Sequence, residues 1–218
     1  MYTGIIENTG TLASLEHRGK GAVIKVKTPE EFRVRERVHL GDSVALNGVC
    51  VTAITIDSDG FSADLSAETM ALTCFQYYRV GQSLNLELPC TPTTHLGGHI
   101  VQGHVDGMGE IVSMQQLDEA MDVTVKAPKD LLPYIAHKGS ITVDGASLTV
   151  NGLRDDQFRL TLIPHTMETL AFENWKTGTK VNLEVDIIAR YLERMVDCKY
   201  DAKEKQGLTY QTLVENGF

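Results

Sequence analysis

Short apolar runs separated by turn residues follow one another along the chain and predict an all-β protein. The runs are rich in Val, Ile, Leu and Thr, and Gly, Asn or Asp stands between them. We expect strands at 22–27, 43–46, 49–54, 61–65 and 84–88, and again at 123–126, 140–143, 147–150, 158–162 and 181–185. Short helical turns are expected near 29–33 and 128–134. Many short strands joined by tight turns are typical of small antiparallel barrels.

An internal repeat divides this pattern into two similar halves. The repeat is visible in separated blocks. At an offset of 97, residues 41–52 match 138–149, residues 80–88 match 177–185, and Thr69 matches Thr166. At an offset of 99, Gly4 and Gly10 match Gly103 and Gly109. A chain of 218 residues can bury one large core or two small ones, and the repeat favours two. We therefore predict one barrel in residues 1–97 and a second in 98–186, because a repeat of only two units indicates paired globular domains.

The predicted hairpins place similar polar residues on the outside of both barrels. Asn47-Gly48 and Asp144-Gly145 predict type I′ turns that join two strands. Side chains alternate along a strand, and a narrow barrel fills its interior with apolar groups. The residues expected on the outer wall are Cys50 and Thr52 in the first copy, and Ser147 and Thr149 in the second. Polar residues on an exposed strand face are often surface residues without a function. Their equivalence in both copies nevertheless favours a binding site between barrels.

The C-terminal segment 187–218 lies outside the repeat and begins with a predicted amphipathic helix. Charged residues lie opposite a set of apolar residues that recur at helical spacing. The apolar residues are Ile187, Ile188, Tyr191, Leu192, Met195 and Val196. We expect this helix to serve as an oligomer contact.

Charge and cysteine usage narrow the class of protein. A net charge of -9 opposes binding to nucleic acid or to an anionic membrane. The N-terminus lacks a basic region before an apolar stretch, and no apolar run approaches the roughly 18 residues of a membrane span, so we expect a cytoplasmic protein. The four cysteines have no C-x-x-C spacing and are expected to be reduced thiols.

A histidine- and glycine-rich segment, residues 95–107, joins the two halves. A metal site is the first reading, but His99 and His104 are five residues apart, on opposite faces of a strand, and no Cys or carboxylate stands at a familiar ligand spacing. We therefore predict no metal. His104 and Asp106 share a face, and an imidazole with a pKa of about 6.5 suits proton transfer near neutral pH. For His99, a structural role in the turn stays open.

Asp186 and Cys50 are two further candidates, and each has a structural explanation as well as a functional one. Asp186 stands between the last strand and the helix, where a helix N-cap is the default role of an aspartate, although capping does not exclude catalysis. Cys50 could be an inert buried thiol, and its outward direction is the sequence reason to expect more.

Several motifs closely resemble those of the riboflavin synthase alpha chain family. They are residues 1–7, 47–52, 97–107 and 144–149, and the similarity extends over nearly the whole chain to 215–218. The resemblance implies two tandem six-stranded antiparallel Greek-key barrels with a C-terminal helix. It also implies a homotrimer, with the active site between the N-terminal barrel of one subunit and the C-terminal barrel of its neighbour.

The reaction implied by the resemblance is the last step of riboflavin biosynthesis. One molecule of 6,7-dimethyl-8-ribityllumazine transfers a four-carbon unit to a second, giving riboflavin and 5-amino-6-(D-ribitylamino)uracil. The family uses no cofactor and no metal, and an association with lumazine synthase is a further possibility.

The same resemblance implies the site residues. The residues expected to carry chemistry are His104, Cys50, Ser43, Ser147 and Asp186. The residues expected to contact substrate in the first barrel are Gly4, Ile5, Ile6, Cys50, Val51, Thr52, Asp64, Leu65, Ser66, Ala67, Glu68, Thr69, Gly103, His104 and Val105. Those expected in the second barrel are Lys138, Ser147, Leu148, Thr149, Thr161, Leu162, Ile163, Pro164, His165 and Thr166. Tyr2 departs from the family, which commonly has Phe there, so its hydroxyl needs a polar partner if it is buried.

Two rival functions stay open at this stage. A non-catalytic lumazine- or flavin-binding antenna protein of the same fold typically loses the site residues of one barrel, whereas this chain keeps Cys50, His104, Ser147 and Thr149. A flavin-binding barrel of a reductase would require a dinucleotide-binding domain, and no G-x-G-x-x-G opens a helix here.

Overall fold

The computed structural model of the chain describes residues 1–205 and 214. Met1–Asp186 form one compact unit, and helix α4 (Ile187–Lys205) belongs to a second. The predicted helix therefore begins where its apolar spacing begins. The rest of the predicted tail, residues 206–213 and 215–218, lies outside the described residues. Within the described part of the chain, no helix is both long and apolar enough to span a bilayer.

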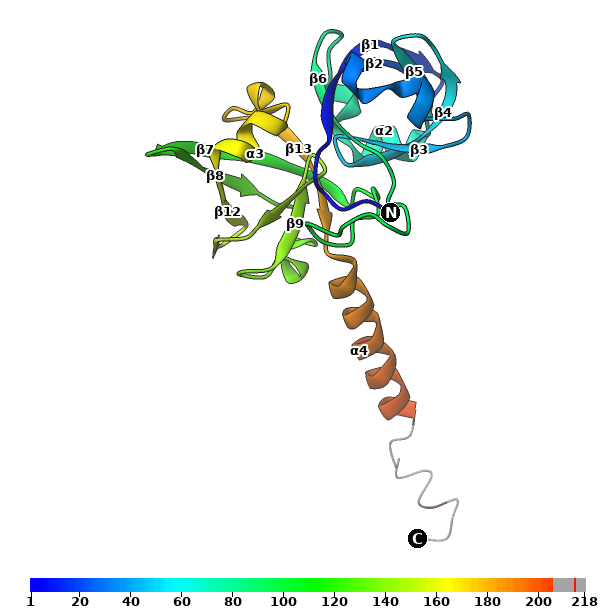
Figure 1. The fold of residues 1–218 in the computed structure, drawn as a ribbon. Coiled ribbons are helices and arrows are strands. Elements are labelled where there is room, and N and C mark those ends of the chain that lie inside the picture. Colours follow the sequence, from blue (N-terminus) through cyan, green and yellow to red (C-terminus); the bar gives the residue numbers. More distant parts are fainter. Residues whose placement is uncertain (206–213, 215–218) are drawn as a thin grey trace. The chain divides into compact units, whose positions relative to one another are not determined.

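The first half folds into a closed antiparallel barrel (Figure 1). Its strands are β1 (Asn8–Arg18), β2 (Gly21–Lys27), β3 (Ser43–Leu46), β4 (Val49–Ile56), β5 (Gly60–Leu65) and β6 (Ser83–Glu87). They are ordered β1-β2-β5-β4-β3-β6, with β6 pairing back onto β1. Alternate side chains of each strand fill the interior, where Leu12, Ile24 and Phe61 are fully buried. The predicted barrel of six strands is confirmed for this half.

The second half forms a curled sheet of the same strand succession. Its strands are β7 (Gly107–Leu117), β8 (Ala120–Lys126), β9 (Ser140–Val143), β10 (Ala146–Thr149), β11 (Gly152–Arg154), β12 (Gln157–Leu162) and β13 (Lys180–Val185). The strand that corresponds to β4 is interrupted at residues 150–151, so β10 and β11 stand at the two ends of the sheet order. Seven strand segments thus replace the six predicted ones, around a separate core that includes Ile111, Phe158 and Leu183.

Short helices lie between the strands of both halves. The α-helices are α1 (Val34–Arg37), α2 (Ala67–Leu72) and α3 (Pro164–Thr169), and the 3₁₀ turns are η1 (Glu30–Phe32), η2 (Cys74–Tyr77), η3 (Leu132–Tyr134) and η4 (Phe172–Asn174). The turns expected near 29–33 and 128–134 are confirmed by η1 and η3. Ser66 caps α2 by accepting the backbone N–H of Thr69, which explains why a helix begins there.

The two longest strands, β1 and β7, were missed by the sequence pattern. Each contains a β-bulge at an equivalent place, between Leu12 and Ser14 in β1 and between Ile111 and Ser113 in β7. A bulge adds one residue to one strand and shifts the alternation of inward and outward side chains. The period of two that identifies a strand in sequence is therefore broken in both.

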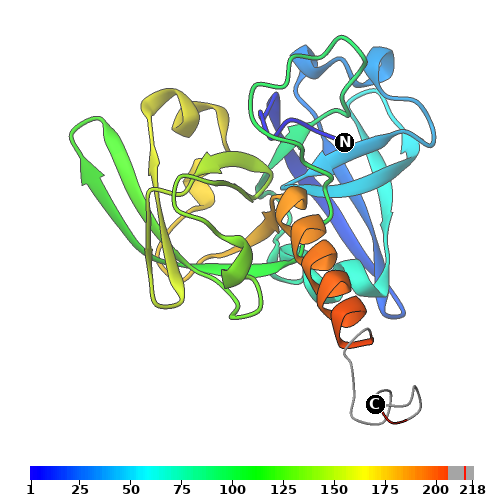
Figure 2. The same ribbon diagram turned by 90° about the horizontal axis from the view of Figure 1, so that it is seen from below.

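Reciprocal hydrogen bonds hold the barrels side by side within the compact unit (Figure 2). Asn85 Nδ2 donates to the carbonyl of Asp144 at 2.8 Å, and its counterpart Asn182 Nδ2 donates to the carbonyl of Asn47 at 2.9 Å. The two type I′ turns meet back to back, because a Cβ on Gly48 would lie 2.7 Å from the nitrogen of Gly145. The predicted turns are confirmed by positive φ at all four residues.

The segment before each barrel reaches across to the other barrel. We call residues 1–7 the N-terminal arm and residues 98–106 the central arm; they pair with each other through Tyr2 and Val101. The carbonyl of Gly4 accepts the backbone N–H of Ser147, and the carbonyl of Gly103 accepts that of Cys50, both at 2.8 Å. Gly4 and Gly103 therefore lie on the outer wall of the opposite barrel, while Tyr2 and His99 of the same arms contact Cys50 and Ser147 of their own barrels.

Candidate active sites

A hollow on the first barrel gathers several of the residues predicted to bind substrate. Its volume is about 230 Å³, and its lining consists of Val49, Cys50, Ser66, Glu68, Thr69, Leu72, Thr73, Gly103, His104 and Val105. Three elements contribute: β4, the capped start of α2, and the central arm. We call this hollow the first site. It brings Cys50 and His104, two of the residues expected to carry chemistry, to one surface.

Gly103 determines how closely the central arm approaches Cys50. Its φ of 79° lies in the left-handed region, and a Cβ there would lie 2.7 Å from the Cβ of Cys50. Only glycine fits both demands. The arm can therefore lie directly on β4 and present the exposed side chain of His104 beside the half-buried Cys50.

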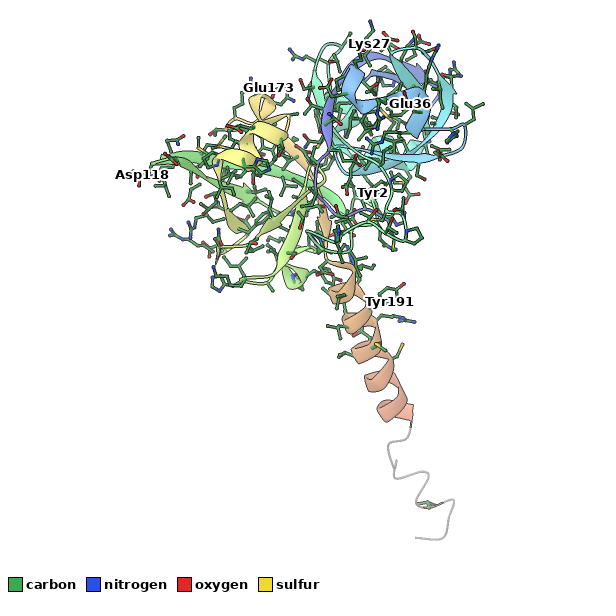
Figure 3. The ribbon with its side chains drawn as sticks, in the orientation of Figure 1. Tyr2, Lys27, Glu36, Asp118, Glu173 and Tyr191 are labelled. Atoms are coloured by element: carbon green, nitrogen blue, oxygen red, sulfur yellow. The ribbon has the colours of Figure 1, made fainter. Side chains whose placement is uncertain are left out.

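Tyr2 supplies a third group at Cys50. Its hydroxyl donates to Cys50 Sγ at 3.2 Å and also hydrogen-bonds the side chain of Ser43. Burial, and after it the contact with Cys50, raises the pKa of Tyr2 far above its ordinary value of 10.0. The phenol therefore stays protonated and can donate. Figure 3 labels Tyr2, on the N-terminal arm.

The second barrel has an equivalent arrangement, which we call the second site, around Ser147. Gly4 of the N-terminal arm approaches Ser147 as Gly103 approaches Cys50, since its φ is 74° and a Cβ would lie 2.6 Å from the Cβ of Ser147. His99 Nδ1 lies 2.7 Å from Ser147 Oγ. Burial lowers the pKa of His99, and the nearby charge of Asp186 opposes that shift. Ser147, His99 and Asp186 therefore form a polar group on this barrel.

His99 is the site residue that sequence reasoning missed as a functional candidate. Its counterpart in the first copy, 99 positions earlier, would precede residue 1, so the repeat could not single it out. The imidazole is 9% exposed and its partner Ser147 stands 48 residues away, so only the fold brings the two together.

The structure shows where several of the residues predicted to contact substrate lie. The sequence assigns Gly4 to the first barrel, but Gly4 lies against Ser147 of the second. Val51, Leu65 and Leu162 have buried side chains in the barrel cores, because they alternate with the outward residues of their strands. Ile6 is likewise buried, in the core of the second barrel.

The remaining predicted residues lie around these two sites or apart from them. Thr52, Asp64 and Thr149 are exposed on the outer wall, and Ala67 starts α2. In the second barrel Leu148 is half-buried, Ile163 stands at the N-cap position of α3, and Pro164, His165 and Thr166 form its first turn. Thr161 Oγ1 donates to Asp122 at 2.5 Å. Val105 and Glu68 border the first site.

Lys138 has an unusual backbone. Its φ is 64°, whereas the equivalent residue of the first copy is Gly41, with φ 88°. A lysine in the left-handed region is strained relative to glycine, and such strain is characteristic of functional sites. The side chain is exposed.

Ser43 and Ile5 border a separate, larger hollow of about 730 Å³. Thr3, Arg37 and His95 also line it. Ser43 is therefore linked to Cys50 through the hydroxyl of Tyr2 rather than through the first site itself. Among the described residues, no three His, Cys, Asp or Glu side chains are grouped so as to hold a metal ion. All four cysteines are free thiols.

Comparison with known proteins gives a consistent family. The lumazine binding domain family matches twice, over residues 3–89 and 102–186. Riboflavin synthase of Photobacterium phosphoreum is 39% identical over 218 residues, which cover 100% of this chain and 99% of that enzyme. Riboflavin synthase of Bacillus subtilis (strain 168) is 38% identical over 100% of both chains. That of Mycobacterium bovis is 42% identical over 200 residues, 90% of this chain and 98% of the enzyme.

Solved structures agree on the fold. LumP complexed with 6,7-dimethyl-8-(1'-D-ribityl) lumazine aligns with a TM-score of 0.77 and 22% identity, covering 85% of this chain and 99% of LumP. LumP complexed with riboflavin aligns with a TM-score of 0.79 and 23% identity over the same shares. The duplicated domain and the full-length similarity to several enzymes lead to one assignment. This chain belongs to the riboflavin synthase family and consists of two lumazine-binding repeats followed by a C-terminal helix.

Proposed function

We propose that this chain converts two molecules of 6,7-dimethyl-8-ribityllumazine into riboflavin and 5-amino-6-(D-ribitylamino)uracil. The observation that carries the proposal is the pair of equivalent outer-wall sites, one around Cys50 and one around Ser147, each covered by an arm of the other barrel. A reaction between two copies of one substrate needs two similar binding surfaces. Holding the two rings together makes a bimolecular step effectively unimolecular, an effect worth up to roughly 7 to 11 kcal/mol.

The proposed chemistry uses side chains of the two sites. The 7-methyl group of one lumazine loses a proton, and His104 is suited to take it and return it later. A nucleophile adds to the other ring, and the candidates are the thiol of Cys50, the hydroxyl of Ser147 and water. His99 is placed to hold the Ser147 hydroxyl at 2.7 Å. These groups transfer protons and add to carbon without a redox or metal partner, so we propose that the reaction requires no cofactor.

The finer organisation is proposed on the same basis. We propose a homotrimer in which the first site of one subunit faces the second site of its neighbour, with the apolar positions of α4 in the oligomer contact. The division at 97/98 and 186/187, a cytoplasmic location and an association with lumazine synthase complete the proposal. Sedimentation equilibrium of the full chain tests the trimer, and a monomer at micromolar concentration would contradict it.

The alternative is a non-catalytic lumazine- or flavin-binding protein, which the fold of LumP favours. Polar residues at both sites support the enzyme: Cys50 and His104 on the first barrel, Ser147 and His99 on the second. The relatives named riboflavin synthase, at 38–42% identity over most or all of the chain, support it further.

The deciding experiment mixes the purified protein with 6,7-dimethyl-8-ribityllumazine after treatment with a chelator and follows lumazine and riboflavin by absorbance. The enzyme predicts one riboflavin for each two lumazines consumed. Tight binding without turnover would instead support the binding protein. Restoration of turnover by an added metal would contradict the cofactor-independent mechanism.

A further inference from the structure

Two buried carboxylates occupy equivalent positions in the last strands of the two barrels. Glu87 ends β6 and Glu184 lies in β13, 97 positions later, and each is 4% exposed. Burial of a carboxylate is unfavourable unless donors surround it. Here the donors are backbone N–H groups of the arms.

Glu184 holds the central arm at the point where the arm meets the first site. Its Oε1 accepts the N–H of Gln102 at 2.6 Å, and its Oε2 accepts the N–H of Gly103 at 2.9 Å. The N–H of His104 also interacts with this carboxylate. The carbonyl of the same Gly103 accepts the N–H of Cys50. A carboxylate of the second barrel thus fixes the backbone that carries His104 over Cys50 of the first.

Glu87 repeats this arrangement for the second site. Its Oε1 accepts the N–H of Thr3 at 2.6 Å and the hydroxyl of Thr3 at 2.7 Å, and its Oε2 accepts the N–H of Gly4 at 3.1 Å. The carbonyl of Gly4 accepts the N–H of Ser147. A carboxylate of the first barrel therefore fixes the arm that covers the second site.

We propose that Glu184 and Glu87 are positioning residues, each of which sets the geometry of the site on the opposite barrel through the arm that it holds. Glu184 acts on the Cys50–His104 site, and Glu87 acts on the Ser147 site. The inference rests on the proposed function of these sites. Charge-assisted hydrogen bonds are roughly twice as strong as neutral ones, so a carboxylate is suited to holding a backbone segment in one position.

A matched pair of variants tests this proposal. Glutamine is nearly isosteric with glutamate, but it has one carbonyl oxygen and an NH₂ group that cannot accept. Glu184→Gln leaves a donor of the central arm facing another donor, and Glu87→Gln does the same to the N-terminal arm. Both variants are made in a chain that also carries Cys90→Ser and Cys198→Ser. The two remaining thiols are then the half-buried Cys50 and the buried Cys74.

Two readouts need no substrate: alkylation of Cys50 by iodoacetamide and hydrogen exchange of the arm peptides. We expect Glu184→Gln to change the Cys50 alkylation rate by about fivefold or more and to speed exchange in residues 98–106. Glu87→Gln should speed exchange in residues 1–7 and change the Cys50 rate by at most about threefold, because the N-terminal arm reaches Cys50 only through the hydroxyl of Tyr2. Equal effects of both variants on Cys50, or no effect of Glu184→Gln, would overturn the proposal.

Turnover supplies the functional readout. Both variants are expected to lower kcat for riboflavin formation by roughly tenfold or more, with a smaller change in KM, because misplaced groups act chiefly in the transition state. Unchanged kcat in both would contradict a positioning role. A variant that fails to fold is replaced by the corresponding Glu→Asp, which keeps two acceptor oxygens, with the same selectivity expected. A wild-type chain without turnover would defeat the proposed function, whereas the labelling and exchange results would still decide this inference.

Discussion

The hydroxyl of Tyr2 donates a hydrogen bond to the sulfur of Cys50 across 3.2 Å, joining the N-terminal arm to the outer wall of the first barrel. The two residues stand 48 positions apart, and the same hydroxyl also meets Ser43. Tyr2 is 1% exposed, so its hydroxyl has protein partners instead of bulk water. The sequence predicts that a buried hydroxyl of Tyr2 needs a polar partner, and Cys50 and Ser43 are its partners.

Tyr2→Phe should release the thiol without removing the packing of the ring. A hydrogen bond of this kind contributes roughly 1 kcal/mol, or about fivefold in an equilibrium. We expect Cys50 to be alkylated a fewfold faster and riboflavin formation to stay within about fivefold of wild type. Rates are measured with iodoacetamide in the Cys90→Ser, Cys198→Ser chain. Ser43→Ala is the matched control, since it removes the other partner and leaves the bond to sulfur; an unchanged rate in Tyr2→Phe would disprove the restraint.

Glycine replacements should separate backbone strain from collision. Gly41 has φ 88° and open space around it, so Gly41→Ala should cost only about 1 kcal/mol. Gly103→Ala and Gly4→Ala add a collision with the backbone and Cβ of Cys50 or Ser147, which should cost a further 1–3 kcal/mol or so. Urea unfolding followed by fluorescence gives these differences. Equal destabilisation in all three variants would show that the arms can move away without loss.

Lys138→Gly should increase stability while weakening substrate binding. Relief of the left-handed backbone is worth about 1 kcal/mol, which raises Tm by roughly 2–4 °C in a chain of this size. If the side chain contacts substrate, KM should rise at the same time. Arg33→Gly is the control, because Arg33 is also a long basic residue, with φ 49°, and borders neither site. We expect Tm to rise in both variants and KM to rise only in Lys138→Gly. An unchanged KM in Lys138→Gly would exclude a contact between Lys138 and substrate.

Stability should fall as the pH rises from about 5 to 8. Burial raises the pKa of Asp144 from 3.8 to about 7, although Asn182 N–H and Trp175 Nε1 donate to it, and burial likewise raises the pKa of Glu184 to about 7. A raised acid pKa favours the protonated folded state, so this stabilisation is complete below about pH 4 and is lost as pH passes 7. Each group contributes a slope of at most about 1.4 kcal/mol per pH unit.

Asp144→Asn isolates this contribution. His99, whose pKa is lowered by burial, acts in the opposite direction up to about pH 6.5, so the comparison between variant and wild type is what matters. Trp175, the single tryptophan, lies 3.0 Å from Asp144 and reports unfolding by its fluorescence. The variant should lose stability at acid pH and show a shallower decline between pH 5 and 8. Parallel curves for the two proteins would mean that Asp144 does not titrate in this range.

The duplication, most strands and turns of each copy, the start of the C-terminal helix, and the outward polar residues of β4 and β10 could be predicted from the sequence. These depend on local rules: alternation along a strand, the positive φ of Asn-Gly and Asp-Gly turns, and helical spacing. Strands β1 and β7 were not predicted, because their bulges interrupt the alternation of inward and outward side chains.

The contacts of Gly4 and Gly103 with the opposite barrels, the bond between His99 and Ser147, and the hold of Glu87 and Glu184 on the arms depend on the packing of the two barrels. Hydrogen bonds between residues 48 to 84 positions apart depend on how the barrels pack, and no local pattern encodes such distances. Gly4 illustrates the difference. Its sequence equivalence to Gly103 was visible, but the barrel that it contacts follows from the crossing of the two arms.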